Sequence, residues 1–349
     1  MSAVNDINPA DREWDLPMAD PAWLAQHHEN ALEPDMPILD PHFHLWTIGR
    51  FNYWVAEYAA DLRAGHNVIA TIYMEASTRY RDDGPEELRC VGETEFAYEQ
   101  CQGSRGLIAS GIVSYANLRA PQQLDRVLDA HLEAAHGRLC GIRDMADWDP
   151  DPTLRDERYD LPENILDLPQ FRASVRQVGE RGLVCDLWTY FHQLEKLAEV
   201  ANAAPGTNIV VNHVGGIIHR GGYGGRQDEV ARIWEQGMRA LSQCPNVFVK
   251  LGGMGMQWME PDLPSQPRPP SSEDLAKRWG PYVSKIIALF GPERCMFESN
   301  FPVDGRVCTY VTLWNAFKRM SAQFSPIERD LLFRKTALDL YKVKLPAAA

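Results

Sequence analysis

Hydrophobic residues along this chain gather in eight short runs, separated by longer and mostly polar segments. The runs are nearly continuous in apolar residues, unlike strands that alternate apolar and polar positions. Parallel strands buried on both faces require runs of this kind. We therefore expect eight buried strands, at Ile38–Phe43, Val68–Met74, Leu107–Val113, Leu139–Arg143, Leu183–Trp188, Asn208–His213, Val247–Leu251 and Cys295–Ser299.

The segments between these runs carry helical patterns. In Pro121–Ala135, four apolar residues recur at spacings of three and four, which places them on one face of a helix. Similar patterns predict helices at His192–Ala203, Gln227–Leu241, Ser272–Phe290 and Val307–Phe324.

Eight strand–helix units favour an α/β protein built as a single (β/α)8 TIM barrel. We place the barrel at residues 38–345 and expect residues 1–37 to form an N-terminal extension that packs on it. A doubly wound open sheet is the alternative. It is weakened because no Gly-x-Gly-x-x-Gly motif follows the first run.

Composition limits the partners and the compartment. The chain has 349 residues, of which 45% are hydrophobic, enough for a large core. Its formal net charge of −13 argues against nucleic acid or an anionic membrane as a partner, because both would be repelled. No signal peptide and no apolar stretch long enough to span a membrane is found. The seven cysteines lack a Cys-x-x-Cys pair, which suits free thiols in the cytoplasm.

The end of the first predicted strand carries a pair of histidines. Asp40, His42 and His44 alternate along the chain, so we expect all three to point to the same side of the strand. Two neutral imidazoles on one face can hold one cation. Taken alone, such a pair is more often explained by local hydrogen bonds.

Polar residues also follow the ends of other predicted strands. The active site of a TIM barrel lies at the C-terminal ends of its strands. Four of the ten histidines fall there, more than a random scatter would give. The polar residues at these ends are His42, His44, Glu75, Arg143, Asp144, His192, His213, Lys250, Asn300 and Asp304.

Six segments, in this order and spacing, resemble the lactonase-like branch of the amidohydrolase superfamily, metal-dependent hydrolases with a TIM-barrel fold. The segments are Leu39–Trp46, Gly141–Arg143, Asp186–Leu194, Val211–Gly216, Asn246–Gly253 and Arg294–Asp304. The resemblance covers the chain from about Ile38 to Tyr341. It implies hydrolysis of lactones of sugar acids or of aromatic-degradation intermediates, whereas relatives in the wider superfamily decarboxylate aromatic acids or open amides.

The resemblance implies roles for single residues. His42, His44 and His192 match the metal ligands of the family, and one divalent ion, zinc or manganese, is expected. His213 matches a histidine that lies near the metal or the substrate. Arg143 matches an arginine that binds a substrate carboxylate through its planar guanidinium group. Catalysis without a metal stays an alternative, because some lactonase relatives need none.

The last predicted strand departs from the family pattern. Many relatives have an aspartate there that is both metal ligand and general base, whereas this chain has Asn300. A neutral amide orients water but accepts no proton at neutral pH. Asp304 either takes over this role or caps the following helix, Arg306–Phe324. The catalytic candidates are therefore Asp304, Asn300 and His213.

The remaining substrate-binding candidates are aromatic residues and a loop arginine. Trp46 and Tyr190, together with Trp188, are expected to form an apolar wall for a ring, although core packing explains each of them equally well. Arg226 belongs to a glycine-rich loop that is either a lid over an anionic substrate or a solvated loop. Glu75 is expected to be a salt-bridge partner, and Lys250 either an ion-pair partner or a substrate contact.

We therefore expect an enzyme that opens a lactone or a similar activated carbonyl of a small, acidic molecule. A metal-dependent decarboxylase of an aromatic acid is the first alternative. A catalytically inert barrel that acts as a binding protein is the second, suggested by the asparagine at position 300. Association into a homo-oligomer is left open by the sequence.

Overall fold

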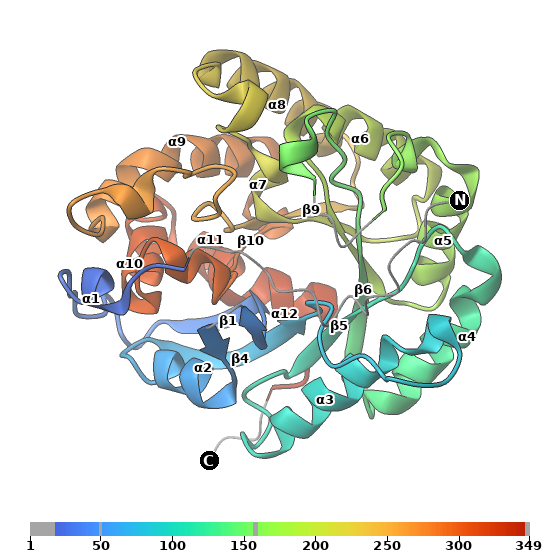
Figure 1. Cartoon of the computed structure of the whole chain (residues 1–349). Coiled ribbons are helices and arrows are strands. Elements are labelled where there is room, and N and C mark those ends of the chain that lie inside the picture. Colours follow the sequence, from blue (N-terminus) through green and yellow to red (C-terminus); the bar gives the residue numbers. More distant parts are fainter. Residues whose placement is uncertain (1–17, 49–50, 156–159, 346–349) are drawn as a thin grey trace.

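The structure is a computed structural model of the chain, and it describes residues 18–48, 51–155 and 160–345. Eight parallel strands follow one another in chain order around a single sheet. Helices surround this sheet, so that Figure 1 shows a ring of strands inside a ring of helices. The strands are β1 (Pro37–Phe43), β4 (Asn67–Met74), β5 (Gly111–Tyr115), β6 (Leu139–Met145), β7 (Val184–Trp188), β8 (Ile209–Val211), β9 (Val247–Leu251) and β10 (Cys295–Phe297).

The sheet closes where the first and last strands meet. Phe43 and Phe301 form a parallel bridge, and the main-chain N–H of His44 donates to the carbonyl oxygen of Phe301 at 2.8 Å. The N–H of Asn300 donates to the carbonyl oxygen of His42 at 2.9 Å. Closure therefore sets the strand-one histidines beside Asn300, although more than 250 residues separate them in the chain.

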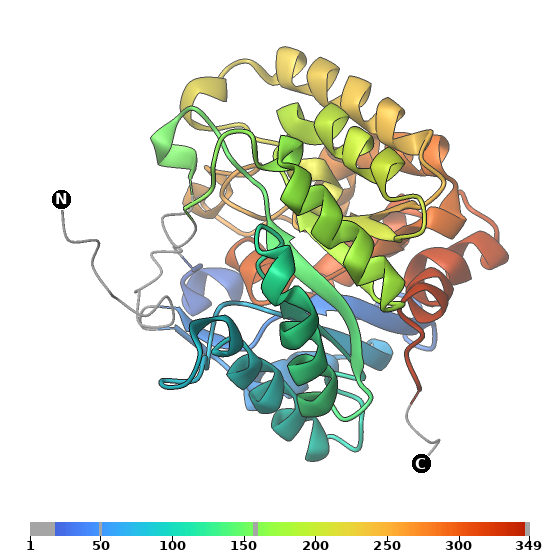
Figure 2. The ribbon, with the colours of Figure 1, turned by 90° about the vertical axis from the view of Figure 1, so that its right-hand side faces the viewer.

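The helices run alongside the strands, which the side view of Figure 2 shows most plainly for the segments around β6. A short antiparallel hairpin, β2 (Trp46–Ile48) and β3 (Phe51–Tyr53), follows β1. The helices are α1 (Pro21–Leu24), α2 (Val55–Leu62), α3 (Val91–Gln102), α4 (Pro121–Ala134), α5 (Pro169–Glu180), α6 (Leu194–Ala203), α7 (His213–Gly216), α8 (Gln227–Ser242), α9 (Ser272–Phe290), α10 (Tyr310–Met320), α11 (Pro326–Asp330) and α12 (Thr336–Tyr341).

The C-terminal segment fills the barrel interior beneath the histidines. Residues from six strands pack with it in one apolar cluster. On the strands that lead to residues of the predicted site, they precede those polar residues. The cluster includes Leu39, Ile72, Val184, Val210 and Met296 together with Leu340, Tyr341 and Val343. One end of the barrel is thus packed with side chains, and the predicted chemistry lies toward the other.

The eight predicted strands and the single TIM barrel are confirmed, with shifted bounds. The third strand begins at Gly111 because the residues before it form a turn, in which the Ser110 hydroxyl donates to the carbonyl oxygen of Gly106 at 2.6 Å. The sixth strand ends at Val211, since His213 has a left-handed backbone with φ of 52°. Among the described residues, no helix combines the length and the apolar character needed to cross a bilayer.

The described part of the N-terminal extension is tied to helix α10. The Lys318 ammonium group donates to the carbonyl oxygens of Leu32 and Glu33 at 2.7 and 2.8 Å. The N–H of Leu32 donates to the side-chain oxygen of Asn315 at 2.7 Å. Residues 1–17 of the predicted extension lie outside the described residues.

Candidate active site

A β-bulge divides the strand-one motif between two faces. The register with β4 shifts between Asp40 and Phe43. Asp40 accepts hydrogen bonds from the hydroxyls of Tyr58 and Tyr310 at 2.9 and 3.0 Å, so it faces the surrounding helices. His42 instead meets side chains of other strands inside the barrel. The expectation that Asp40 shares a face with His42 is wrong, because the extra residue of a bulge breaks the two-residue alternation of a strand.

His42 and His44 turn their Nε2 atoms toward each other, 3.1 Å apart. His44 donates its Nδ1–H to the carbonyl oxygen of Met74 at 2.9 Å, so its Nε2 carries the lone pair of the neutral ring. Two nitrogens bound to one ion at about 2.0–2.1 Å stand about 3 Å apart. The separation and the tautomer of this pair therefore fit two ligands of a single divalent ion.

Burial keeps the site imidazoles neutral. It lowers the pKa of His42, His44 and His213 well below the ordinary value of 6.5. The cationic side chain of Arg143 lowers the pKa of all three rings further, and that of Lys250 lowers the pKa of His42 and His213. A neutral imidazole is the form that binds a metal ion, and it is also the form that accepts a proton.

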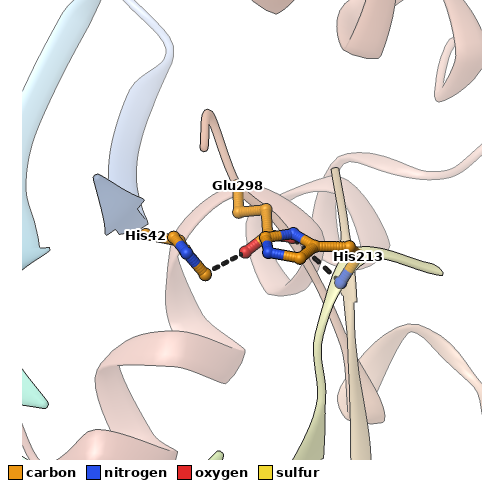
Figure 3. Close-up of side chains that lie close together, drawn as sticks. All are labelled: His42, His213 and Glu298. Carbon is orange, nitrogen blue, oxygen red and sulfur yellow. Dashed lines mark hydrogen bonds and ion pairs between the residues drawn. The ribbon is translucent and has the colours of Figure 1, made fainter. Parts of the chain in front are cut away.

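Glu298 lies between His42 and His213 and contacts both rings (Figure 3). Its Oε1 lies 2.8 Å from Nδ1 of His213, and its Oε2 lies 2.7 Å from Nδ1 of His42. In the described ranges, these three side chains form a group whose candidate metal-ligand atoms all lie within 4.8 Å of one another. Burial raises the pKa of Glu298 to about 8. The sequence analysis gave Glu298 no role, although a glutamate directly after an apolar strand was a usable signal.

A left-handed turn after β8 carries His213. Both His213 and Val214 have positive φ angles, of 52° and 49°. Such a backbone costs on the order of 1–3 kcal/mol for a residue with a side chain, so the surrounding contacts must hold it. The turn directs His213 across the barrel mouth, where its ring packs edge-on against Trp188 with 4.8 Å between the ring centres. Three of the four histidines expected at the barrel mouth, His42, His44 and His213, thus lie together.

Arg143 is held by Glu75. Its Nε donates to Glu75 Oε1 and its Nη2 to the carbonyl oxygen of Glu75, both at 2.6 Å. Its Nη1 lies 3.4 Å from Nε2 of His42 and faces the histidine pair. The expected salt-bridge role of Glu75 is confirmed. Two of the three guanidinium nitrogens are used in this contact, which limits how Arg143 can bind a substrate.

Lys250 forms a buried ion pair inside the barrel. Its ammonium group donates to Asp186 Oδ1 at 2.8 Å and lies 3.4 Å from Nδ1 of His42. The hydroxyl of Tyr341 donates to the second oxygen of Asp186 at 2.8 Å. Of the two roles considered for Lys250, the ion pair is the one that the structure shows.

Asp304 is buried and supports Asn300. Its Oδ1 accepts the side-chain N–H of Asn300 at 3.1 Å, and burial raises its pKa to about 8. The cap of α10 is Thr309, whose side chain accepts the N–H of Thr312. The expectation that Asp304 caps this helix is therefore wrong. The side chain of Asn300 also forms a hydrogen bond with His44.

A pocket lies beside the histidines. Its apolar walls include three tryptophans, Trp46, Trp188 and Trp258. Its polar lining residues are His44, His213, Arg143, Asn300, Asp147 and Gln257. Asp147, just after β6, is a carboxyl group at the pocket that the sequence analysis missed, because it lies in a loop and outside any apolar run.

Three predicted site residues lie elsewhere. His192, expected as a metal ligand with His42 and His44, instead pairs through Nε2 with Asp149 at 2.9 Å. Tyr190 is fully buried, and its hydroxyl donates to the carbonyl oxygen of Leu154 at 2.5 Å, so it packs behind Trp188 and does not line the pocket. Arg226 is half exposed and paired with Glu229 in the first turn of α8, the helix that follows it.

Comparison with known proteins gives consistent results. The family model described as amidohydrolase matches residues 39–343. An uncharacterized protein, y4mH of Sinorhizobium fredii, is 30% identical over 338 residues, covering 88% of this chain and 99% of its own. L-fucono-1,5-lactonase of Burkholderia multivorans is 24% identical over 324 residues, covering 89% of this chain and 98% of its own.

Solved structures share the fold. The crystal structure of an amidohydrolase from Burkholderia multivorans, with bound HEPES, has a TM-score of 0.68 and is 21% identical, covering 88% of this chain and all of its own. A second crystal form of this target contains bound zinc and has a TM-score of 0.65. These structures agree with the barrel described above.

Proposed function

This chain belongs to the amidohydrolase family, and we propose that it hydrolyses a lactone or a similarly activated carbonyl group of a small, acidic molecule. One observation carries the proposal. Three neutral imidazoles, those of His42, His44 and His213, gather at the mouth of the barrel beside an apolar pocket. The full-length similarity to a lactonase supports this reaction over others of the family.

Hydrolysis requires an activated water and a stabilised carbonyl oxygen. We assign the first task to His213, whose neutral ring lines the pocket. It removes a proton from water while the water oxygen bonds to the carbonyl carbon. The ring C–O bond then breaks, and the same proton passes to the leaving ring oxygen. The product is a hydroxy acid, with all atoms of the water retained.

The groups that stabilise the carbonyl oxygen lie on the side of the pocket that carries positive charge. His42 and His44 would hold a divalent ion, and zinc in the related Burkholderia structure supports that metal, with manganese as the other candidate. When bound, such an ion supplies Lewis-acid polarisation of the carbonyl group. Arg143 Nη1 and the amide of Asn300 face the same space and orient the substrate there. Catalysis without a metal would depend on these two groups alone.

The walls of the pocket favour a ring-shaped substrate. Trp46, Trp188 and Trp258 present large, rigid faces on which a flat or weakly puckered ring can stack. Arg143 contributes positive charge, but its ion pair with Glu75 compensates part of that charge. We therefore propose that a substrate carboxylate receives one hydrogen bond from Nη1 and not a two-point clamp.

Decarboxylation of an aromatic acid is the second candidate. The neutral amide of Asn300 and the tryptophan walls favour it, since releasing carbon dioxide from an aromatic ring needs no activated water. An inert barrel that only binds its ligand is the third reading. The two reactions differ in product, so one set of assays separates them.

The test incubates the protein with a panel of sugar-acid lactones, unsaturated lactones and aromatic acids. The release of acid and the release of carbon dioxide are measured for each compound. We expect ring opening of at least one lactone, and a loss of about 100-fold or more in kcat/KM for His42→Ala. Carbon dioxide release without ring opening would select the decarboxylase. Ligand binding without any turnover would select the inert barrel.

A further inference from the structure

We propose that Glu298 is the positioning residue of His213, and that its carboxyl group and the imidazole form a hydrogen-bonded dyad with His213 as the general base. This inference rests on the proposed function, because it specifies how water is activated in that reaction. The proton-accepting group, His213, lies on the turn after β8, and its partner, Glu298, lies just after β10. Strand β9 stands between β8 and β10 in the sheet.

The hydrogen bonds of Glu298 determine the tautomer of His213. Oε1 accepts two donors from His213, the ring Nδ1–H at 2.8 Å and the main-chain N–H at 3.3 Å. Because Oε1 already accepts the main-chain N–H of His213, we take it as the acceptor toward the ring of His213 as well. The ring proton then lies on Nδ1. The lone pair is then on Nε2, at the ring edge away from Glu298. Since His213 lines the pocket, Nε2 is the nitrogen available to a water there.

The other polar groups at the pocket are less suited to accept a proton. Asn300 has a neutral amide. Asp304 is buried behind Asn300 and is protonated at neutral pH, since burial raises its pKa to about 8. Arg143 is cationic and paired with Glu75. Asp147 also lines the pocket, which makes it the competing base that an experiment must separate from His213.

Two glycines after β9 make room for the dyad. A Cβ atom on Gly252 would lie 2.4 Å from Cγ of Glu298 and 2.3 Å from its carbonyl oxygen. A Cβ atom on Gly253 would lie 2.3 Å from Nδ1 of His213, the atom that donates to Glu298. The backbone just after β9 thus passes directly against both members of the pair. Side chains at these two positions would push the carboxylate and the imidazole apart.

The kinetic test compares two buried glutamates. Glu298→Gln keeps the shape but puts an NH2 donor in place of one carboxyl oxygen, and we expect kcat to fall by about 100-fold, with KM changing by less than about threefold. Glu93→Gln is the matched control. Glu93 is also buried with a pKa near 8, but its carboxylate accepts from the hydroxyl of Tyr73 and the N–H of Ala76. Equal kcat values for the two variants would overturn the proposal. So would a larger loss of kcat for Asp147→Asn than for His213→Asn.

A second measurement does not depend on turnover. In the metal-stripped protein with nitrogen-15-labelled histidine, NMR reports the protonated nitrogen of each ring, and His213→Asn identifies the signal of His213. We expect the Nδ1–H form. An Nε2–H form of His213 would overturn the dyad whatever the reaction is. If no lactone is opened while His213 shows Nδ1–H, the proposed reaction fails, and the positioning role of Glu298 still stands.

Discussion

At the scale of single residues, burial decides which groups at the barrel mouth can exchange a proton. Asp304 and Asn300 share a hydrogen bond of 3.1 Å, and the side chain of Asp304 is fully buried. Its raised pKa means that the folded protein holds it in the neutral form at pH 7. We therefore assign Asp304 to the support of Asn300, and not to the abstraction of a proton.

Asp304→Asn should retain kcat within about tenfold at neutral pH, because the substituted group was already neutral. Its effect on stability should depend on pH. The pKa of Asp304 is about 8 in the folded protein and 3.8 ordinarily. Between these values the folded wild type keeps a proton that the unfolded chain loses, so its free energy of unfolding falls as pH rises and levels off above about 8.

The asparagine variant lacks this titration, so its stability relative to the wild type should grow from about pH 4 to about pH 8. Each unit of the pKa shift corresponds to about 1.4 kcal/mol. Urea unfolding at several pH values measures this difference. A loss of kcat beyond about 100-fold in a folded variant would instead identify Asp304 as the base.

At the scale of elements, the turns after the strands position the chemistry. The left-handed turn of α7 and the two glycines after β9 meet at the Glu298–His213 pair. Neither feature follows from hydrophobic periodicity, which ends with the strand. The bulge in β1 is equally hidden, because it depends on pairing with β4. The strands themselves were predictable, since burial on both faces leaves an apolar run in the sequence.

Gly253→Ala tests this arrangement. Gly253 has φ of +67°, and its new methyl group would lie 2.3 Å from His213 Nδ1, so we expect kcat to fall at least about tenfold as the imidazole is displaced. Gly137→Ala is the control, with φ of +83° and nothing within 4 Å of its Cβ position. Both variants should lose on the order of 1 kcal/mol of stability through backbone strain, and Gly253→Ala should lose more because its methyl group overlaps the buried imidazole. Urea unfolding measures both losses. Unchanged kcat in Gly253→Ala would show that the glycine is not needed to place His213.

At the scale of the whole molecule, closure of the barrel brings distant segments together. His42 and Asn300 become neighbours because β1 pairs with the segment after β10. The sequence located these residues at strand ends, and the fold makes strand ends converge, so much of the site was predictable. His192 and Tyr190 were misplaced because they follow β7 in a turn, where the direction of a side chain no longer follows from strand alternation. Glu298 was missed because its role depends on contacts across the barrel, and Asp147 because it lies in a loop outside any apolar run.

The most direct test of the account is the fate of water oxygen. The reaction of the substrate that the panel identifies should be run in water labelled with oxygen-18. The product should be analysed by mass spectrometry. We predict a product heavier than the substrate by one water, with the label in the new carboxyl group. A product lighter by carbon dioxide, or one without the label, would contradict hydrolysis of a cyclic ester at this barrel mouth.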